Sequence, residues 1–265
     1  MLVVWLTYIL LGVFAGLLAG LLGVGGGIVI VPMLNLTFAL QQLPAGQIQH
    51  LALGTSLATI VFTSLASLRA HHARGAVDWP VVRRISPGIL LGTFAGSFLA
   101  ARLSSDLLKG FFGCFVFFVA WQMLSGAQPH SHRQVPGRTG LSLTGSLIGG
   151  ISSLVGIGGG SMSVPFLLWC NLPARSAIGT SAAIGLPIAL AGAAGYLLNG
   201  LTNPQLPPYT LGYIYLPALA GIAGASYLTA PYGARLAHNL PVSRLKKGFA
   251  CLLIVIGSKM LYSLF

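Results

Sequence analysis

The chain has 265 residues, of which 6% are charged and 55% are hydrophobic, and its mean hydropathy is +0.87. A soluble domain carries about 25% charged residues, so this composition excludes a soluble fold and indicates a polytopic all-α membrane protein. The net charge of +12 does not indicate a nucleic acid partner, because the basic residues lie between apolar runs, as in loops that face anionic lipid. The three cysteines form no CxxC pair, and neither a disulfide, a metal site nor a cofactor is expected.

Apolar segments of about helix length follow one another along the chain in two similar sets. The first set lies at about 2–22, 28–40, 51–68, 85–101 and 110–124, and the second at about 141–155, 161–172, 176–198, 211–230 and 248–264. A polar stretch with prolines, glycines and histidines separates the sets and is typical of a loop. We therefore predict two membrane repeats, residues 1–125 and 141–265, joined by a linker at 126–140 within one integral membrane domain. The first segment has no basic residues before it and is expected to be retained, not cleaved as a signal peptide.

A glycine-rich stretch of ten residues occurs twice, from Gly23 to Pro32 and from Gly156 to Pro165. Four glycines in five residues would cost a helix about 1 kcal/mol each relative to alanine, so each copy predicts an interruption between two helices. We call residues 23–27 the first glycine break and residues 156–160 the second glycine break. A break in the hydrocarbon region survives only where it is packed in protein or lines a cavity.

The helix that follows each break directs its free N–H groups and partial positive charge at the break, which suits an anion. The alternative is close packing of helices through small residues. Ser161 follows the second break where Ile28 follows the first. Its hydroxyl either donates a hydrogen bond to the anion, from the second break only, or caps the helix that follows. The predicted anion-binding glycines are Gly25, Gly26, Gly27, Gly158, Gly159 and Gly160.

Further landmarks recur in the same order in both halves. Gly54-Thr55-Ser56 returns as Gly179-Thr180-Ser181, and Pro87 returns as Pro217. The hydroxyls of Thr55, Ser56, Thr180 and Ser181 lie in otherwise apolar helices. They either donate to the oxygens of an anion or bond within and between helices.

His50 and Arg175 each precede the Gly-Thr-Ser motif of their half by four residues. Four residues are about one helical turn, so each cation lies on the same face as its motif. We hypothesise that the two residues attract or gate the anion from opposite membrane sides, with His50 at the outer mouth and Arg175 at the inner mouth. The alternative is an interfacial cation that extends towards water.

The loop charges change sides between the halves. Four arginines lie at 69–84, whereas the matching loop at 199–210 has no Lys or Arg. The next loop of the first half has only Arg102 and Lys109, whereas the matching loop at 235–247 has four basic residues. Under the positive-inside rule this swap indicates inverted-topology repeats with an odd number of crossings each. Both termini are then external, and every Lys and Arg except Arg102, Lys109 and Lys259 is internal.

An odd number of membrane crossings in each half is compatible with two arrangements. Either all five segments of a half cross the membrane, or the first two form a re-entrant hairpin and three cross. A crossing takes about 20 residues, and segments 28–40 and 161–172 are shorter than that. We favour ten membrane-embedded helices, with the two breaks near the midplane.

The acidic residues are too few to hold a cation by charge within the membrane, and sodium bound only by backbone carbonyls and hydroxyls is the alternative. Asp78 and Asp106 are the only ones, and both fall in predicted loops, whereas a cation transporter normally has a carboxylate within the membrane. No GxxxxGK[ST] motif is present to indicate ATP as the energy source. The composition therefore favours a transporter for a small anion. Two alternatives are a membrane assembly or scaffold protein without cargo and an intramembrane enzyme with Ser161 as nucleophile, which would need a base within reach.

The chain resembles the sulfite exporter TauE/SafE family, also called TSUP. The resemblance rests on the doubled GxGGG-x4-P, on the Gly-Thr-Ser helix after each copy, on Gly75 and Trp79 in the following loop, and on the chain length. It covers essentially the whole chain and implies a bacterial or archaeal inner-membrane protein that moves sulfite, thiosulfate or sulfonates. Ile28, in place of a second serine, departs from strict symmetry between the halves. Together with the resemblance, these observations lead us to expect an exporter of a sulfur oxyanion and not an enzyme. We expect it to work by alternating access around an anion site near the membrane midplane.

Overall fold

The computed structural model describes all residues except 1, 24, 126–134, 240–241 and 263–265. The described part of the chain is almost entirely helical, which confirms the predicted all-α class. Its helices are α1 (Leu2–Leu22), α2 (Gly27–Leu40), α3 (Ala45–His72), α4 (Trp79–Arg102), α5 (Ser105–Leu124), α6 (Arg138–Val155), α7 (Gly160–Trp169), α8 (Ala174–Leu201), α9 (Leu216–Asn239) and α10 (Val242–Tyr262). Most of the predicted linker lies outside the described residues, and its last three residues already belong to α6.

Five helices, α1, α3, α4, α5 and α8, are long and apolar enough to cross a membrane. Helices α2 and α7 have only 14 and 10 residues. At 1.5 Å per residue they extend about 21 and 15 Å, which is short of the roughly 30 Å hydrocarbon layer. The protein is therefore a multi-pass membrane protein in which α2 and α7 cannot cross alone.

Several helices extend beyond the apolar segments that predicted them. Helix α3 begins at Ala45, directly after Pro44, and helix α4 begins at Trp79, not near residue 85. The carboxylate of Asp78 accepts the N–H of Val81 at 3.1 Å and so caps the first turn of α4. Hydropathy alone misses such ends, because the terminal turns of membrane helices carry polar residues.

The predicted helical segment at 211–230 starts too early, which is a correction to the sequence prediction. Strands β1 (Thr210–Leu211) and β2 (Ile214–Tyr215) form a short antiparallel hairpin in front of α9. Gly212 in the turn has φ +55°, a value that glycine adopts without strain. The hairpin occupies residues that hydropathy alone assigns to the start of the helix.

The two longest helices, α3 and α8, pack against each other at the centre of the protein and run antiparallel. Near the start of α3, a Cβ atom on Gly54 would contact the carbonyl of Tyr213, which follows α8. Near the start of α8, a Cβ atom on Gly179 would contact the carbonyl of Ala76, which follows α3. Each helix therefore begins where the other ends.

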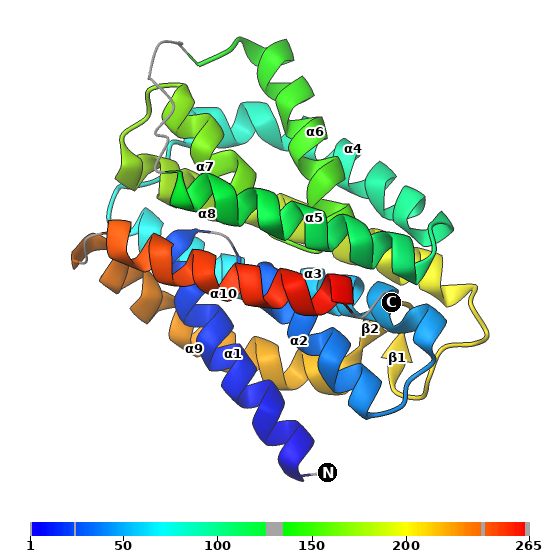
Figure 1. The fold of residues 1–265 in the computed structure, drawn as a ribbon. Helices are drawn as coiled ribbons and strands as arrows, with labels where there is room; N and C mark the ends of the chain where they lie inside the picture. Colours follow the sequence, from blue (N-terminus) through cyan, green and yellow to red (C-terminus); the bar gives the residue numbers. More distant parts are fainter. Residues whose placement is uncertain (1, 24, 126–134, 240–241, 263–265) are drawn as a thin grey trace.

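The outer helices pair across the two halves of the chain. Helix α1 packs on α9, α4 packs on α6, and α5 packs on α10, as Figure 1 also shows. The first two pairs are close, because a Cβ atom on Gly12 would lie 2.6 Å from the carbonyl oxygen of Ile222, and one on Gly92 would lie 2.6 Å from the Cα atom of Ser146. Small residues let membrane helices approach in this way. Helix α1 of the first half corresponds to α6 of the second, and α4 corresponds to α9. The α1–α9 pair is therefore the counterpart of the α4–α6 pair.

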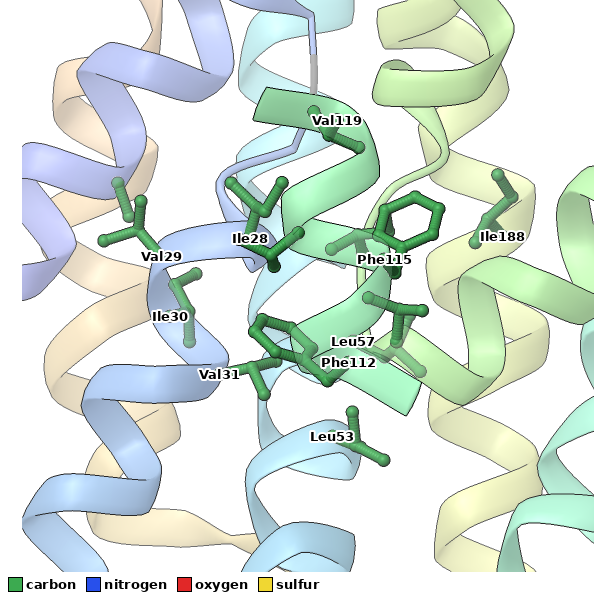
Figure 2. Packing of buried hydrophobic residues seen from close by; sticks show 14 of the residues in the cluster. Ile28, Val29, Ile30, Val31, Leu53, Leu57, Phe112, Phe115, Val119 and Ile188 are labelled. Atoms are coloured by element: carbon green, nitrogen blue, oxygen red, sulfur yellow. The ribbon is translucent and has the colours of Figure 1, made fainter. Parts of the chain in front are cut away.

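The apolar core surrounds the start of α2. Figure 2 shows side chains of α2, α3, α5 and α8 gathered at this level. Ile28, the first residue after Gly27, is only 1% exposed, and Phe112 of α5 belongs to the same cluster with no exposed surface. The first glycine break therefore leads directly into hydrocarbon-like packing.

Candidate functional site

The two glycine breaks have matching backbone conformations at their first and fourth positions, although Gly25 has a positive φ and its counterpart Gly158 does not. Gly26 precedes α2 with φ 77° and ψ −13°, and Gly159 precedes α7 with φ 74° and ψ −8°. Gly23 and Gly156, which begin the breaks, have φ 67° and 70°. These left-handed values favour glycine strongly, so the repeated glycines are explained by backbone geometry as well as by space.

The breaks meet each other inside the protein. A Cβ atom on Gly25 would lie 3.2 Å from the Cα atom of Gly158, and a Cβ atom on Gly27 would contact the carbonyl oxygen of Gly156. Segments more than a hundred residues apart in the sequence therefore form one structural unit. The close packing predicted as the alternative role of the glycines is present here, alongside any role in binding.

The serines of the two Gly-Thr-Ser motifs hold the breaks crosswise. The hydroxyl of Ser56 donates to the carbonyl of Gly156 at 2.7 Å, and the hydroxyl of Ser181 donates to the carbonyl of Gly23 at 3.1 Å. Each serine thus binds the break of the opposite half. In this conformation both hydroxyl protons are committed to carbonyl oxygens of the protein, and Ser163 also contacts Ser181 at 2.8 Å.

The threonines of the same motifs make an equivalent pair of contacts with loops. Thr55 accepts the backbone N–H of Tyr215 at 2.9 Å, and Thr180 accepts the backbone N–H of Asp78 at 2.9 Å. Tyr215 directly precedes α9 and Asp78 directly precedes α4, so the two contacts occupy corresponding places in the halves. The sequence could not reveal these partners, because they lie more than a hundred residues from the threonines.

Unpaired donors collect at the second break. Within the described part of the chain, the N–H groups of Gly158, Gly159 and Gly160 donate no hydrogen bond to the protein. The hydroxyl of Ser161 is also without a partner, although this residue is only 5% exposed. Ser152, which the sequence analysis missed, is fully buried with an unpaired hydroxyl, and that oxygen lies 3.4 Å from where a Cβ atom of Gly159 would be.

The first break has no comparable hydroxyls. Aligning the two glycine stretches places Ile28 opposite Ser161 and Ala19 opposite Ser152, and both residues are 1% exposed. The N–H groups of Gly25, Gly26 and Gly27 likewise donate no hydrogen bond within the described part of the chain, so the two breaks differ in their hydroxyls and not in their backbone donors. A sequence comparison of the two copies over a longer stretch would have found the Ala19–Ser152 difference.

His50 and Arg175 occupy corresponding positions but different surroundings. His50 is buried, with Nε2 3.1 Å from the carbonyl oxygen of Ala100 and Nδ1 3.3 Å from the hydroxyl of Ser105. Its ring also stacks on Tyr213 with centroids 5.2 Å apart. Arg175, in contrast, is exposed at the start of α8. In the described part of the chain neither side chain forms a hydrogen bond or ion pair with the glycine breaks, so their predicted part in binding or gating stays a prediction.

The geometry around Ser161 does not resemble that of a catalytic nucleophile. A nucleophilic serine needs a base within hydrogen-bond reach, and the Ser161 hydroxyl has no partner in the described part of the chain. The unpaired donors can instead bind an electron-rich group, because backbone N–H groups and a serine hydroxyl at a helix start stabilise negative charge.

Comparison with known proteins gives a consistent result. A family model described as "Sulfite exporter TauE/SafE" matches residues 8–260. A probable membrane transporter protein of Haemophilus influenzae is 41% identical over 260 residues, which covers 96% of this chain and 97% of that protein. Probable membrane transporter proteins of Bacillus subtilis and Methanocaldococcus jannaschii are 26% and 27% identical, and each comparison covers 96% of this chain and at least 94% of the relative. No solved structure matches the chain.

The match to the family model covers nearly the whole chain, including both glycine breaks and both Gly-Thr-Ser motifs. The relatives are named as transporters and not as enzymes. Together with its membrane-spanning helices, this shows that the chain belongs to the sulfite exporter TauE/SafE family and is a multi-pass membrane transporter.

Proposed function

We propose that the protein exports a small sulfur-containing oxyanion, such as sulfite, thiosulfate or a sulfonate, and binds it at the second glycine break. The observation that carries this proposal is the set of buried, unpaired donors there: the N–H groups of residues 158–160 and the hydroxyls of Ser161 and Ser152. Membership of a family described as sulfite exporters supports the sulfur oxyanion as cargo.

The energetics favour a ligand at this place. A buried polar group without a partner costs about 1–3 kcal/mol, so several at one place leave a large binding free energy available. The start of α7 adds a partial positive charge next to Ser161, and no acidic side chain belongs to the break. An oxyanion with three or more oxygens can accept from several of these donors at once, whereas a neutral solute would gain less.

The first break is proposed to support the site mainly by packing. Gly25, Gly26 and Gly27 bring the backbone of α2 against the second break, and the neighbouring Ile28 keeps water away from that side. Excluding water strengthens the electrostatic attraction between an anion and the donors. Ser56 and Ser181 would hold the breaks together in this state and release the Gly156 and Gly23 carbonyls in another. Thr55 and Thr180 are proposed to hold the residues in front of α9 and α4 against the same two helices.

The transport mechanism is proposed to be alternating access by two inverted repeats, residues 1–125 and 141–265. The antiparallel packing of α3 and α8 supports this arrangement, as do the crosswise contacts of the Gly-Thr-Ser motifs. Arg69 and Arg235, from the two predicted cytoplasmic loops, line the same cleft, which agrees with the charge bias. Exporting an anion from a negative cell interior is downhill by about 2.3 kcal/mol per charge per 100 mV, so export needs no coupling ion.

Arg175 and His50 are proposed to act at the two ends of the pathway. Arg175 is exposed at the start of α8 and would attract an anion to the inner mouth. His50 joins the start of α3 to the α4–α5 connection through Ala100 and Ser105. Breaking these contacts would be required for the outer mouth to open.

Thermal unfolding of the purified protein in detergent tests the proposal. Samples are titrated with sulfite, thiosulfate, sulfate, sulfoacetate and chloride. A ligand that binds only the folded state stabilises it by about 2.7 kcal/mol at a hundredfold excess over Kd. We expect one sulfur oxyanion, and not chloride, to raise the unfolding temperature.

The site is tested with Ser161→Ala and Ser152→Ala, which remove the unpaired hydroxyls. Ser97→Ala is the matched control, because Ser97 is also fully buried but bonds within its own helix to the carbonyl of Phe94. The stabilisation by the anion should fall in the first two variants and persist in the control. An absence of stabilisation by any anion would contradict an anion as the cargo, and an equal loss in all three variants would contradict a site at the second break.

A further inference from the structure

A cleft lies far from the glycine breaks in sequence, between the end of α3 and the end of α9. Its volume is about 410 Å³. Arg69 and Arg74 line it from the α3 side, and Tyr227 and Arg235 line it from α9. Alanines of α3 and a proline of α9 complete its wall, so the cleft combines three guanidinium groups with an apolar surface.

The positive charge of this cleft is not neutralised by the protein. The whole chain has only two acidic residues, and the ion pair found in its described part joins Lys109 to Asp106. Asp78 is used in capping α4. Arginine stays charged at any physiological pH, and the end of α3 contributes only about half a negative charge. A net attraction for anions therefore remains.

The arginines are held in position by neighbours that leave donors free. A guanidinium N–H of Arg69 donates to the hydroxyl of Tyr227 at 2.8 Å, which links α3 to α9. Arg74 donates to the carbonyl of Ala70 at 3.2 Å, one turn earlier. Each guanidinium has five N–H donors, so most of them remain available. A planar guanidinium binds a phosphate or sulfur oxyanion through two parallel hydrogen bonds.

In the other half of the protein, the two cleft arginines on the α3 side have no charged counterpart. Aligning the two Gly-Thr-Ser motifs places Ala194 opposite Arg69 and Asn199 opposite Arg74. The cleft is thus a property of one membrane face, the one that the charge bias predicts to be cytoplasmic. Arg69 lies in the last turn of the membrane helix α3. At that depth the cytoplasmic leaflet presents its phosphate headgroups, many of them anionic.

We propose that this cleft is a binding site for the phosphate headgroup of an anionic phospholipid. The guanidinium groups match a phosphate oxyanion, and the alanine and proline wall suits the glycerol and the first methylenes of a lipid better than a fully hydrated ion. A headgroup held by Arg69 and Arg235 would join α3, which carries Ser56 and Thr55, to α9. The bound lipid would therefore stabilise the packing of α3 against α9. This inference is independent of the transported cargo.

The test measures thermal unfolding of the full-length protein in mixed micelles. Phosphatidylglycerol is compared with phosphatidylcholine and with inorganic phosphate and sulfate at matched concentrations. The variant Arg69→Gln/Arg235→Gln removes two of the three cleft charges. The control Arg83→Gln/Arg84→Gln removes two exposed charges from the same predicted membrane face, outside the cleft.

We expect phosphatidylglycerol to raise the unfolding temperature of the wild type and of the control, with an apparent affinity at least about tenfold weaker in the cleft variant. Equal weakening in the control would show diffuse surface attraction and overturn the proposal. Equal stabilisation by free phosphate or sulfate would replace the lipid with a soluble oxyanion as the ligand. If the double variant does not fold, the same comparison is made with Arg74→Gln, which removes a cleft charge without touching the Arg69–Tyr227 contact. A weaker apparent affinity for phosphatidylglycerol in this variant than in the control would support the proposal, and an equal affinity would overturn it.

Discussion

Replacing Gly27 by alanine tests whether the two glycine breaks meet as described. Gly27 begins α2, and an added Cβ atom would contact the carbonyl oxygen of Gly156. It would also lie 2.9 Å from the Cα atom of Ile157 and 2.8 Å from the Cδ1 atom of Ile60. The Ile60 side chain can rotate away, but the other two atoms are backbone of the opposite break. The substitution must therefore push the two breaks apart.

The expected size of the effect follows from two opposing terms. Gly27 has no positive φ, so alanine is not strained there and can gain up to about 1 kcal/mol of helix propensity. Inserting one methyl group into a close-packed site costs about 1–3 kcal/mol, and the upper part of that range applies where backbone must move. We expect a net loss of about 1–2 kcal/mol. For a chain of this size each kcal/mol lowers the unfolding temperature by about 2–4 °C.

The measurement is the unfolding temperature of purified variants in one detergent. Gly224→Ala in α9 is the matched control, because an added Cβ atom there meets no atom within 4 Å. The control should be as stable as the wild type or slightly more stable. If Gly27→Ala proved as stable as Gly224→Ala, the breaks would not be in contact, and the packing argument would be refuted.

The remaining predictions concern single hydrogen bonds, and all are measured as changes in unfolding temperature. Tyr196→Phe should destabilise the protein by about 1–3 kcal/mol, because the fully buried hydroxyl donates to the carbonyl of Ser153 at 2.9 Å. Asp78→Ala should cost about 0.5–2 kcal/mol through the lost cap of α4, whereas Asp78→Asn should keep most of the stability, and equal losses would contradict the capping role. Ser56→Ala should cost about 1 kcal/mol by freeing the Gly156 carbonyl, and an unchanged value would contradict that bond.

The sequence predicted the order of the helices because hydropathy reports which residues are buried or face lipid. It also predicted both interruptions, since repeated glycines at one offset are incompatible with a regular helix. It did not predict the ends of α3 and α4, where Pro44 and Asp78 set the boundaries through local backbone geometry. The hairpin before α9 was missed for a similar reason, because its turn depends on Gly212 and is too short for a periodic signal.

The candidate site was predictable in most of its residues but not in its connections. The Gly-Thr-Ser motifs and the Ile28–Ser161 difference are visible in the sequence. That Ser56 binds the break of the other half is a long-range contact, and one sequence contains no information on such pairs. Ser152 was missed because a serine in a membrane helix ordinarily bonds within its own helix, and only the structure reveals a buried hydroxyl without a partner.

The crosswise contacts constrain how access can alternate. A rigid movement of residues 1–125 against 141–265 would break the contacts of both serines and both threonines of the Gly-Thr-Ser motifs, at about 0.5–1.5 kcal/mol each. It would also separate α1 from α9 and α4 from α6, which pack too closely to slide. A movement of α2, α3, α7 and α8 as a central unit, relative to the α1–α9 and α4–α6 pairs, also has to break the serine contacts, because Gly23 and Gly156 end α1 and α6. It keeps the two close helix pairs intact, however. The close packing of the outer pairs therefore favours a central unit that moves between them over two halves that rock against each other.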